Sequence, residues 1–75
     1  MTRLPRVSGR QCCEALGRAA FVHIRQHGSH IVLRRLDPLA QLVVPDHREL
    51  DRGTLRAILR HADVSVEEFV HLLGE

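Results

Sequence analysis

The hydrophobic pattern of the chain begins with a helix. Ser8-Gly9-Arg10-Gln11 has the form of a capping box, in which the serine and glutamine side chains each bond the other residue's backbone N–H. Beyond it, Cys12, Leu16, Ala19 and Ala20 fall at helical spacing and form one apolar stripe. We therefore predict an amphipathic helix that starts after Ser8 and runs to about Ala19.

Two short segments of alternating polarity follow and predict a β-hairpin. Apolar side chains occupy alternate positions in Phe21–Arg25, and the same alternation runs through His30–Arg35. Between them, Gln26-His27-Gly28-Ser29 has the composition of a turn, with a glycine that adopts backbone angles closed to other residues. We expect the two strands to pair as antiparallel neighbours.

The apolar positions also predict how these strands align. Where one face of a sheet is buried, apolar side chains pair with apolar side chains. The aligned pairs are then Val22 with Leu33 and Ile24 with Ile31. The same alignment sets Arg25 directly beside His30, on the face turned away from the helices, and His23 projects from that face as well.

The second half of the chain predicts one more strand and two helices. Leu36–Ala40 contains a proline and has the composition of a turn, and Gln41–Val44 follows it as a third strand. Arg52–Ala62 carries apolar residues at helical spacing. Ser65-Val66-Glu67-Glu68 is a second capping box and opens a short last helix.

This element order, α-β-β-β-α-α, predicts an α+β fold in which helices cover one face of a three-stranded antiparallel sheet. We expect one domain spanning residues 1–75. A domain of this size buries only about 60% of its unfolded surface, so an active site is expected on an open face. No apolar run reaches about 18 residues and no signal peptide begins at Met1, so we expect a cytoplasmic protein without a membrane span.

Charge is distributed unevenly along the chain. Residues 1–36 hold seven arginines and one acidic residue, for a net charge of +6, whereas residues 37–75 hold four arginines and eight acidic residues, for a net charge of −4. A basic half suits a polyanion such as nucleic acid. Phe21 and Phe69 are the chain's two aromatic residues, so we expect binding to depend on phosphate contacts more than on base stacking.

Gly28-Ser29-His30 is the candidate chemical site. Glycine lets a backbone approach a phosphate closely, and histidine is the side chain best able to move a proton near neutral pH. RNA carries its own nucleophile, the 2′-OH, so its cleavage needs only proton transfer and cations that stabilise the phosphorane charge. His30, with Arg25 beside it and Arg34 further along the same face, meets that minimum without a metal or cofactor.

A metal site is one alternative. Asp46 and His47 are adjacent but have no third ligand placed near them, and the hairpin histidines (His23, His27 and His30) converge only if the turn folds back. The two adjacent cysteines point apart on a helix, so they complete no zinc site and have no expected redox role. We therefore expect no metal.

Three further alternatives stay open at the level of residues. His30 could be an exposed strand residue without a role. The chain could also bind RNA through phosphate contacts without cleaving it. A DNA-binding helix-turn-helix over residues 55–73 is the third, although Glu67 and Glu68 would place negative charge where a recognition helix meets DNA.

The chain resembles the HicA (YcfA-like) toxin family over nearly its whole length. The motifs that carry the likeness are Leu4-Pro5-x-Val7-Ser8-Gly9, Arg25-x-x-Gly28-Ser29-His30, Val44-Pro45-x-His47, Leu50-x-x-Gly53-Thr54-Leu55-Arg56-x-Ile58-Leu59-Arg60 and Ser65-Val66-Glu67-Glu68-Phe69. Gly-Ser-His alone would be a weak motif, but the ordered set is specific.

This resemblance implies a fold similar to a double-stranded-RNA-binding domain. It implies the toxin of a type II toxin–antitoxin pair, a ribosome-independent endoribonuclease that cleaves mRNA and arrests translation. It also implies a HicB-like antitoxin that masks the site in a hetero-oligomer. The family's catalytic histidine maps onto His30, with Gly28 and Ser29 as the turn that places it and Arg25 and Arg34 as substrate contacts.

Overall fold

The computed structural model describes residues 2–74 and confirms the predicted α+β architecture. The elements are α1 (Gly9–Gly17), β1 (Val22–His27), β2 (His30–Leu36), β3 (Leu39–Pro45), α2 (Arg52–Ala62) and α3 (Val66–Leu72). The three strands form one antiparallel sheet in the order β1-β2-β3.

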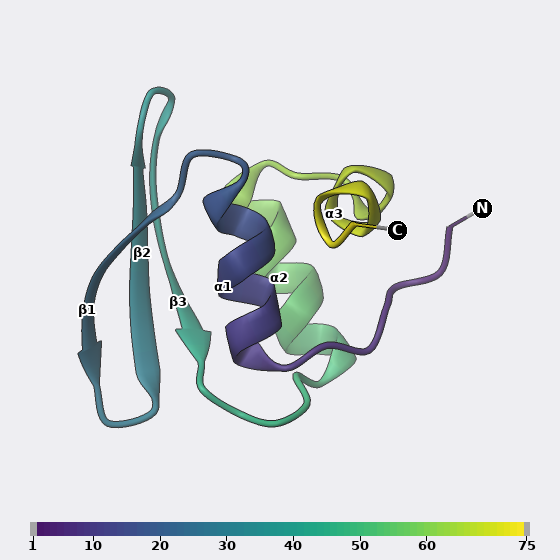
Figure 1. Cartoon of the computed structure of the whole chain (residues 1–75), viewed down its shortest axis with the longest axis horizontal. Helices are drawn as coiled ribbons and strands as arrows, with labels where there is room; N and C mark the ends of the chain where they lie inside the picture. The colour runs from purple at the N-terminus through teal and green to yellow at the C-terminus, as the bar shows by residue number, and fades with distance from the viewer. Residues whose placement is uncertain (1, 75) are drawn as a thin grey trace.

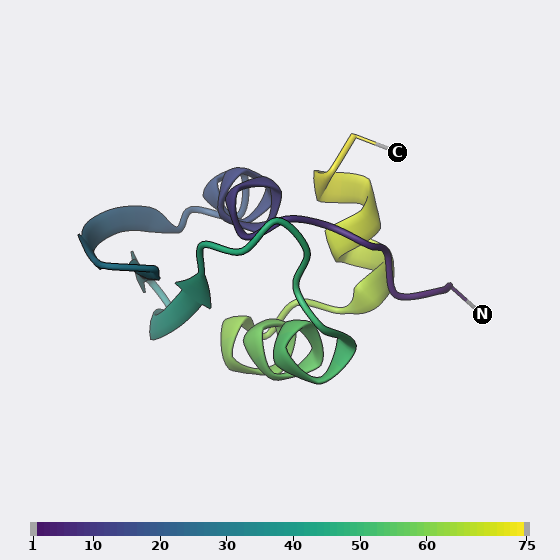
Figure 2. The same cartoon turned by 90° about the horizontal axis from the view of Figure 1, so that it is seen from below.

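The elements lie in layers, with the sheet on one side of the molecule (Figure 1). Helices α1 and α2 lie side by side against one face of the sheet, and α3 lies beyond them on the side away from it (Figures 1 and 2). The Arg18 Nη1 donates to the Leu72 carbonyl at 2.9 Å and thereby joins α1 to α3. In the part of the chain that the structure describes, no helix lies on the opposite face of the sheet, as the sequence predicted.

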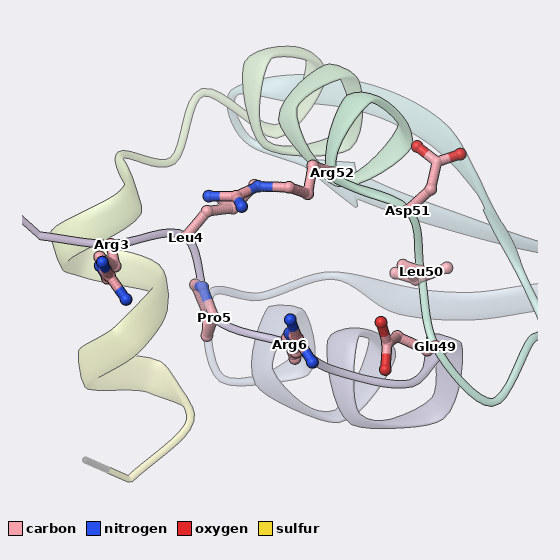
Figure 3. Close-up of a pocket in the computed structure, with 8 residues that line it drawn as sticks. All are labelled: Arg3, Leu4, Pro5, Arg6, Glu49, Leu50, Asp51 and Arg52. Carbon is pink, nitrogen blue, oxygen red and sulfur yellow. The ribbon is translucent and has the colours of Figure 1, made fainter.

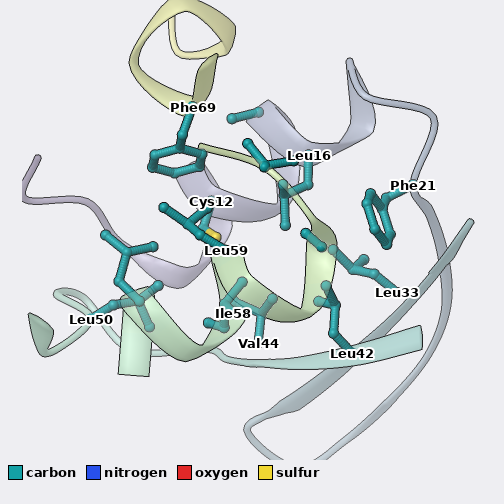
Figure 4. Close-up of a cluster of buried hydrophobic side chains, with 14 of the residues drawn as sticks. Cys12, Leu16, Phe21, Leu33, Leu42, Val44, Leu50, Ile58, Leu59 and Phe69 are labelled. Atoms are coloured by element: carbon teal, nitrogen blue, oxygen red, sulfur yellow. The ribbon is translucent and has the colours of Figure 1, made fainter. Parts of the chain in front are cut away.

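A single cluster of buried apolar side chains fills the space between the sheet and the helices (Figure 4). Leu16 from α1, Val44 from β3, Leu55 from α2 and Phe69 from α3 are its largest fully buried members, together with Cys12. Burying one such side chain contributes about 1.5–3 kcal/mol. The stripe predicted on the second helix is correct, since Leu55, Ile58, Leu59 and Ala62 are all buried.

The first helix starts with the complete predicted capping box, whereas at α3 only its serine half is found among residues 2–74, with the Ser65 hydroxyl accepting from the Glu68 N–H at 3.0 Å. The Gln11 N–H donates to the Ser8 hydroxyl at 3.0 Å, and the Ser8 N–H donates to the Gln11 Oε1 at 2.8 Å. The first helix nevertheless ends at Gly17, two residues before the predicted end. Ala20 adopts a positive φ of 73° there, so the chain turns sharply into β1 instead of continuing the helix.

The first hairpin differs from its prediction. The strands extend to His27 and start again at His30, so the loop contains only Gly28 and Ser29, and His27 is a strand residue. His27, and not Arg25, pairs directly with His30, while Arg25 pairs with Val32. The predicted alignment of Arg25 beside His30 is therefore wrong.

A β-bulge at Ile24 changes the alignment again in the first half of β1. His23 pairs with Leu33 and Arg25 with Val32, which leaves Ile24 without a partner. Ile24 is 40% exposed and Val22 is 61% exposed, although both were expected to be buried. The physical reason is that all six residues of β1 are exposed, whereas β3, the other edge strand, has buried residues, so matching apolar positions did not decide the alignment of β1.

The second hairpin follows the apolar pattern. Ile31 pairs with Val44 and Leu33 with Leu42, and these four side chains all belong to the core. β3 is longer than the predicted 41–44 because its pairing with β2 continues from Leu39 to Pro45. Among residues 2–74, no helix combines the length and the apolar character needed to cross a membrane.

Candidate active site

The open face of the sheet consists of three rows of side chains, because directly paired residues in an antiparallel sheet share a face. Starting from the Gly28–Ser29 loop, the rows are His27, His30 and Pro45; then Arg25, Val32 and Val43; then Val22, Arg34 and Gln41. His30, Arg25 and Arg34 thus share one face, as predicted. His23 does not join them, because it pairs with the core residue Leu33.

The spacing of the rows separates the two arginines. Arg25 lies in the row next to His30, as a diagonal neighbour at about 7–8 Å, which is within reach of a long side chain. Arg34 lies four residues along β2 from His30, about 13 Å at the rise of a strand. The two arginines therefore lie at different distances from His30 along the face.

The Gly28–Ser29 loop holds the two strand ends close together. Gly28 has a positive φ of 55°, the geometry for which glycine is favoured at the first position of a two-residue hairpin loop. The Ser29 carbonyl accepts from the Asp46 N–H at 2.6 Å, and the Gly28 carbonyl accepts from the Gln26 Nε2 at 2.9 Å. Both loop carbonyls are thus fixed by partners outside the loop.

Asp46 connects this loop to helix α1. Its carboxylate accepts from the Arg10 Nε at 3.1 Å, from the Arg10 Nη2 at 3.2 Å and from the Gln26 Nε2 at 3.2 Å. The hydrogen bonds from Arg10 lower the pKa of Asp46 below its ordinary value, with a smaller contribution from Gln26. We call Asp46, Arg10 and Gln26 the loop clamp.

The start of α1 also contacts the end of β3. The Gly9 N–H donates to the His47 carbonyl at 2.8 Å. A Cβ atom at Gly9 would overlap the Pro45 carbonyl oxygen, so only glycine allows this approach. Because Pro45 pairs with His30, the helix start is part of what positions the histidine.

The charge of the open face is positive. Among residues 2–74, its three rows contain no acidic side chain. Arg34 donates to the Gln41 Oε1 from its Nε at 2.9 Å and from its Nη2 at 2.7 Å, so a neutral group orients its guanidinium. Apolar surface adjoins this charge, since Leu36 and Leu39, 78% and 76% exposed, form a pair at the far end of the same face.

A separate hollow of about 670 Å³ lies between the N-terminal segment and the residues that lead into α2 (Figure 3). Its lining contains Arg3, Arg6 and Arg52 together with Glu49 and Asp51, and none of its lining residues belongs to the sheet. No histidine or cysteine lines it. The hollow therefore lacks a side chain suited to proton transfer near neutral pH.

Neither a reactive cysteine nor a three-ligand metal site is found in the part of the chain that the structure describes. Burial raises the pKa of Cys12 to about 12 and that of Cys13 to about 11, which keeps both thiols protonated and unreactive. The two do not bridge each other. Within residues 2–74, no group of three His, Cys, Asp or Glu side chains is arranged to hold a metal ion.

The loop clamp is the part of the site that sequence reasoning missed. From the sequence, Asp46 is a candidate only as a metal ligand with His47. Arg10 lies 36 residues away from it, so the pattern contained no sign of their contact. The glycine at position 9, where alanine would usually be the better helix former, indicates only the close approach of α1 to Pro45.

Comparison with known proteins identifies one family. Residues 9–64 match the family described as HicA toxin of bacterial toxin-antitoxin. The match spans α1, the whole sheet and α2, and so includes the Gly28–Ser29 loop and the loop clamp. A comparison with curated proteins gives no match.

Proposed function

We propose that this chain, which belongs to the HicA family of toxin–antitoxin toxins, is an endoribonuclease that cleaves mRNA with His30 as its proton-transfer residue. The observation that carries the proposal is the exposed His30 beside a two-residue glycine loop, on a sheet face that carries arginines and no acid among the described residues. Cleavage of the mRNA does not require the ribosome, and the loss of intact mRNA arrests translation.

The chemistry requires little of the protein. A 2′-OH attacks the adjacent phosphorus once its proton is removed, and the 5′ oxygen leaves once it receives one. A histidine within hydrogen-bond reach performs such a transfer efficiently near neutral pH. Fixed cations stabilise the additional negative charge of the phosphorane, and Arg25 in the row next to His30 suits that task. No metal ion or cofactor enters this mechanism.

The RNA strand would lie across the three rows. The Gly28–Ser29 loop carries no large side chain, so its backbone can approach a phosphate closely. Arg25 would contact the phosphate that is cleaved, and Arg34, about 13 Å from His30, would contact a neighbouring one. Phe21 and Phe69 are both buried, so base stacking contributes little and phosphate contacts dominate.

A HicB-like antitoxin is the proposed protein partner. It would cover the open face in a toxin–antitoxin hetero-oligomer and block access to His30. Leu36, Leu39 and Val43 are exposed on this face beside Arg25 and Arg34, so a partner surface that combines apolar and acidic groups fits it.

His30→Ala tests the proposal directly. Expressed without an antitoxin, the wild-type protein should arrest growth and fragment mRNA, whereas His30→Ala should do neither. His71→Ala, an exposed histidine on α3 far from the sheet, should remain toxic. The purified protein should cleave RNA in the presence of EDTA.

Three results would contradict the proposal. Full toxicity of His30→Ala would remove the histidine from the mechanism, and loss of cleavage on chelation would favour a metal-dependent one. Tight RNA binding without cleavage at high protein concentration would instead identify a non-catalytic RNA-binding module.

A further inference from the structure

A second histidine stands directly beside the first. His27 and His30 are the two residues that flank the Gly28–Ser29 loop, and they pair with each other across the hairpin. We propose that His27 is the second proton-transfer group of the reaction, so that the two histidines act as an acid–base pair. This inference rests on the proposed function and deepens it.

The pairing places both imidazoles at one edge of the open face. Directly opposed residues have Cβ atoms about 4.5–5.5 Å apart and point to the same side of the sheet. Both side chains are exposed, and neither forms a hydrogen bond or ion pair within residues 2–74. A phosphodiester resting on the loop would therefore have a free imidazole near each of two of its oxygens.

The residues around the pair favour a mechanism in which one histidine acts as the acid and the other as the base. On the other side of His30 stands Pro45 of β3, which has neither a titratable group nor an N–H. The charged side chains facing the pair from β1 and β2 are Arg25 and Arg34, and β3 contributes none to the face. Arg25, in the row next to the pair, can hold the phosphate without competing for its protons, and Arg34 lies one row further away.

Two charged groups near the pair are poorly suited to exchange a proton at neutral pH. The guanidinium of Arg25 stays protonated in proteins. The Asp46 carboxylate is held by Arg10, which lowers its pKa and keeps it ionised. Of the two residues that pair directly with His30, His27 and Pro45, His27 is the one suited to donate or accept the second proton.

The reaction step balances with two histidines. The neutral imidazole removes the 2′-OH proton while the 2′-O–P bond forms, and the protonated imidazole gives its proton to the 5′ oxygen while the P–O5′ bond breaks. The attacking and leaving oxygens stand roughly in line on opposite sides of phosphorus, which suits two groups approaching from two strands. The products are a 2′,3′-cyclic phosphate and a 5′-OH, and proton exchange with water restores the pair.

His27→Gln tests the assignment, with His23→Gln as a matched control. Both residues are exposed histidines of β1, but His23 pairs with Leu33 and lies outside the three rows. On a short fluorogenic RNA, His27→Gln should lower kcat by a factor of about 10²–10⁴ and leave KM within a few-fold. His23→Gln should cleave at the wild-type rate.

The pH profile separates a proton-transfer role from a structural one. Two groups that must hold opposite protonation states give a bell-shaped dependence of kcat/KM on pH. His27→Gln should abolish one limb of the bell and preserve the other. A variant that merely loosened the hairpin would lower the whole curve and keep its shape.

A substrate with sulfur in place of the 5′ bridging oxygen identifies the acid. A thiolate leaves without being protonated, so this RNA bypasses the need for a general acid. One of the two variants, His27→Gln or His30→Gln, should recover most of the wild-type rate on it, and the other should not. Recovery by neither variant would overturn the pair.

The results distinguish failure of this inference from failure of the proposed function. A wild-type rate for His27→Gln together with an inactive His30→Gln would exclude His27 and retain the single-histidine ribonuclease. A wild-type rate for His30→Gln would remove the proposed function itself. A folded wild-type protein that cleaves no RNA would do the same.

Discussion

At the scale of single residues, two glycines are required for different physical reasons. Gly28 has a positive φ of 55° with open space around it, so a side chain there would be strained only by the backbone. Gly9 has no such backbone strain, but a side chain there would overlap the Pro45 carbonyl. The first glycine shapes the loop, and the second allows α1 to dock on the end of β3.

Gly9→Ala is therefore expected to destabilise the protein, although alanine is normally the better helix former. The overlap with backbone should cost about 1–3 kcal/mol, measured as a shift in the urea midpoint. RNA cleavage should fall as well, because Pro45 pairs with His30. Gly17→Ala is the control: nothing stands within 4 Å of its Cβ position, so it should gain up to about 1 kcal/mol. Equal stability of the two variants would contradict the close approach.

At the scale of elements, the first hairpin depends on contacts beyond its own strands. β1 is an edge strand whose six residues are all exposed, so apolar burial contributes little to its position. Its place is set by pairing with β2, by the two-residue loop and by the loop clamp. The hydrogen bonds of Asp46 to Arg10, Gln26 and the Ser29 carbonyl join the hairpin to α1.

Asp46→Asn should loosen this connection. Because the pKa of Asp46 is lowered in the folded state, its carboxylate stabilises the protein above its ordinary pKa of about 3.9. That stabilisation is lost as pH falls from there through the lowered value. At pH 7 the variant should melt at a lower temperature and cleave RNA more slowly than wild type, and the difference in Tm should shrink below pH 4 or so.

Glu49→Gln provides the comparison for that variant. It removes an exposed carboxylate of the same loop that forms no ion pair within residues 2–74. Its melting temperature should follow wild type across the whole pH range. A pH-independent deficit for Asp46→Asn would show that the charge of the clamp is not what stabilises the hairpin.

At the scale of the whole molecule, the open face of the sheet and the helix farthest from it carry opposite charges. The open face carries two arginines and two histidines, while Glu67 and Glu68 lie on α3, the helix farthest from the sheet. This arrangement gives a protein of net charge +2 one surface suited to a polyanion. RNA affinity should accordingly depend on salt and on particular arginines.

Arg25→Gln and Arg34→Gln are each expected to weaken binding of a 2′-O-methyl RNA, which lacks the free 2′-OH that cleavage requires. Removing one phosphate contact should reduce the slope of log affinity against log salt by about 0.7 for a single strand. Arg60→Gln, an exposed arginine of α2, should leave the slope unchanged. Equal slopes for all three variants would mean that the open face does not carry the RNA.

Much of the fold could be predicted from the local sequence pattern. The wrong predictions concern contacts that this pattern does not determine. The apolar stripe of α2 and the Ser8 cap were correct because helical spacing and capping act within a few residues. The open face and its three candidate residues were placed on one surface correctly. The alignment of β1 was wrong because matching Ile24 to Ile31 assumed a buried edge strand, whereas Gly28 imposes a two-residue loop and Ile24 bulges.

The sequence by itself determined the helices, the two-faced sheet and the Gly28-Ser29-His30 motif, because these depend on periodicity and on turn chemistry between near neighbours. Only the tertiary structure decided which side chain stands beside His30. It placed His27 there and moved Arg25 to the next row, because the two-residue loop sets the alignment of the strand residues next to it. It also revealed the contact of Arg10 with Asp46, which joins residues far apart in the chain and leaves no trace in a local pattern.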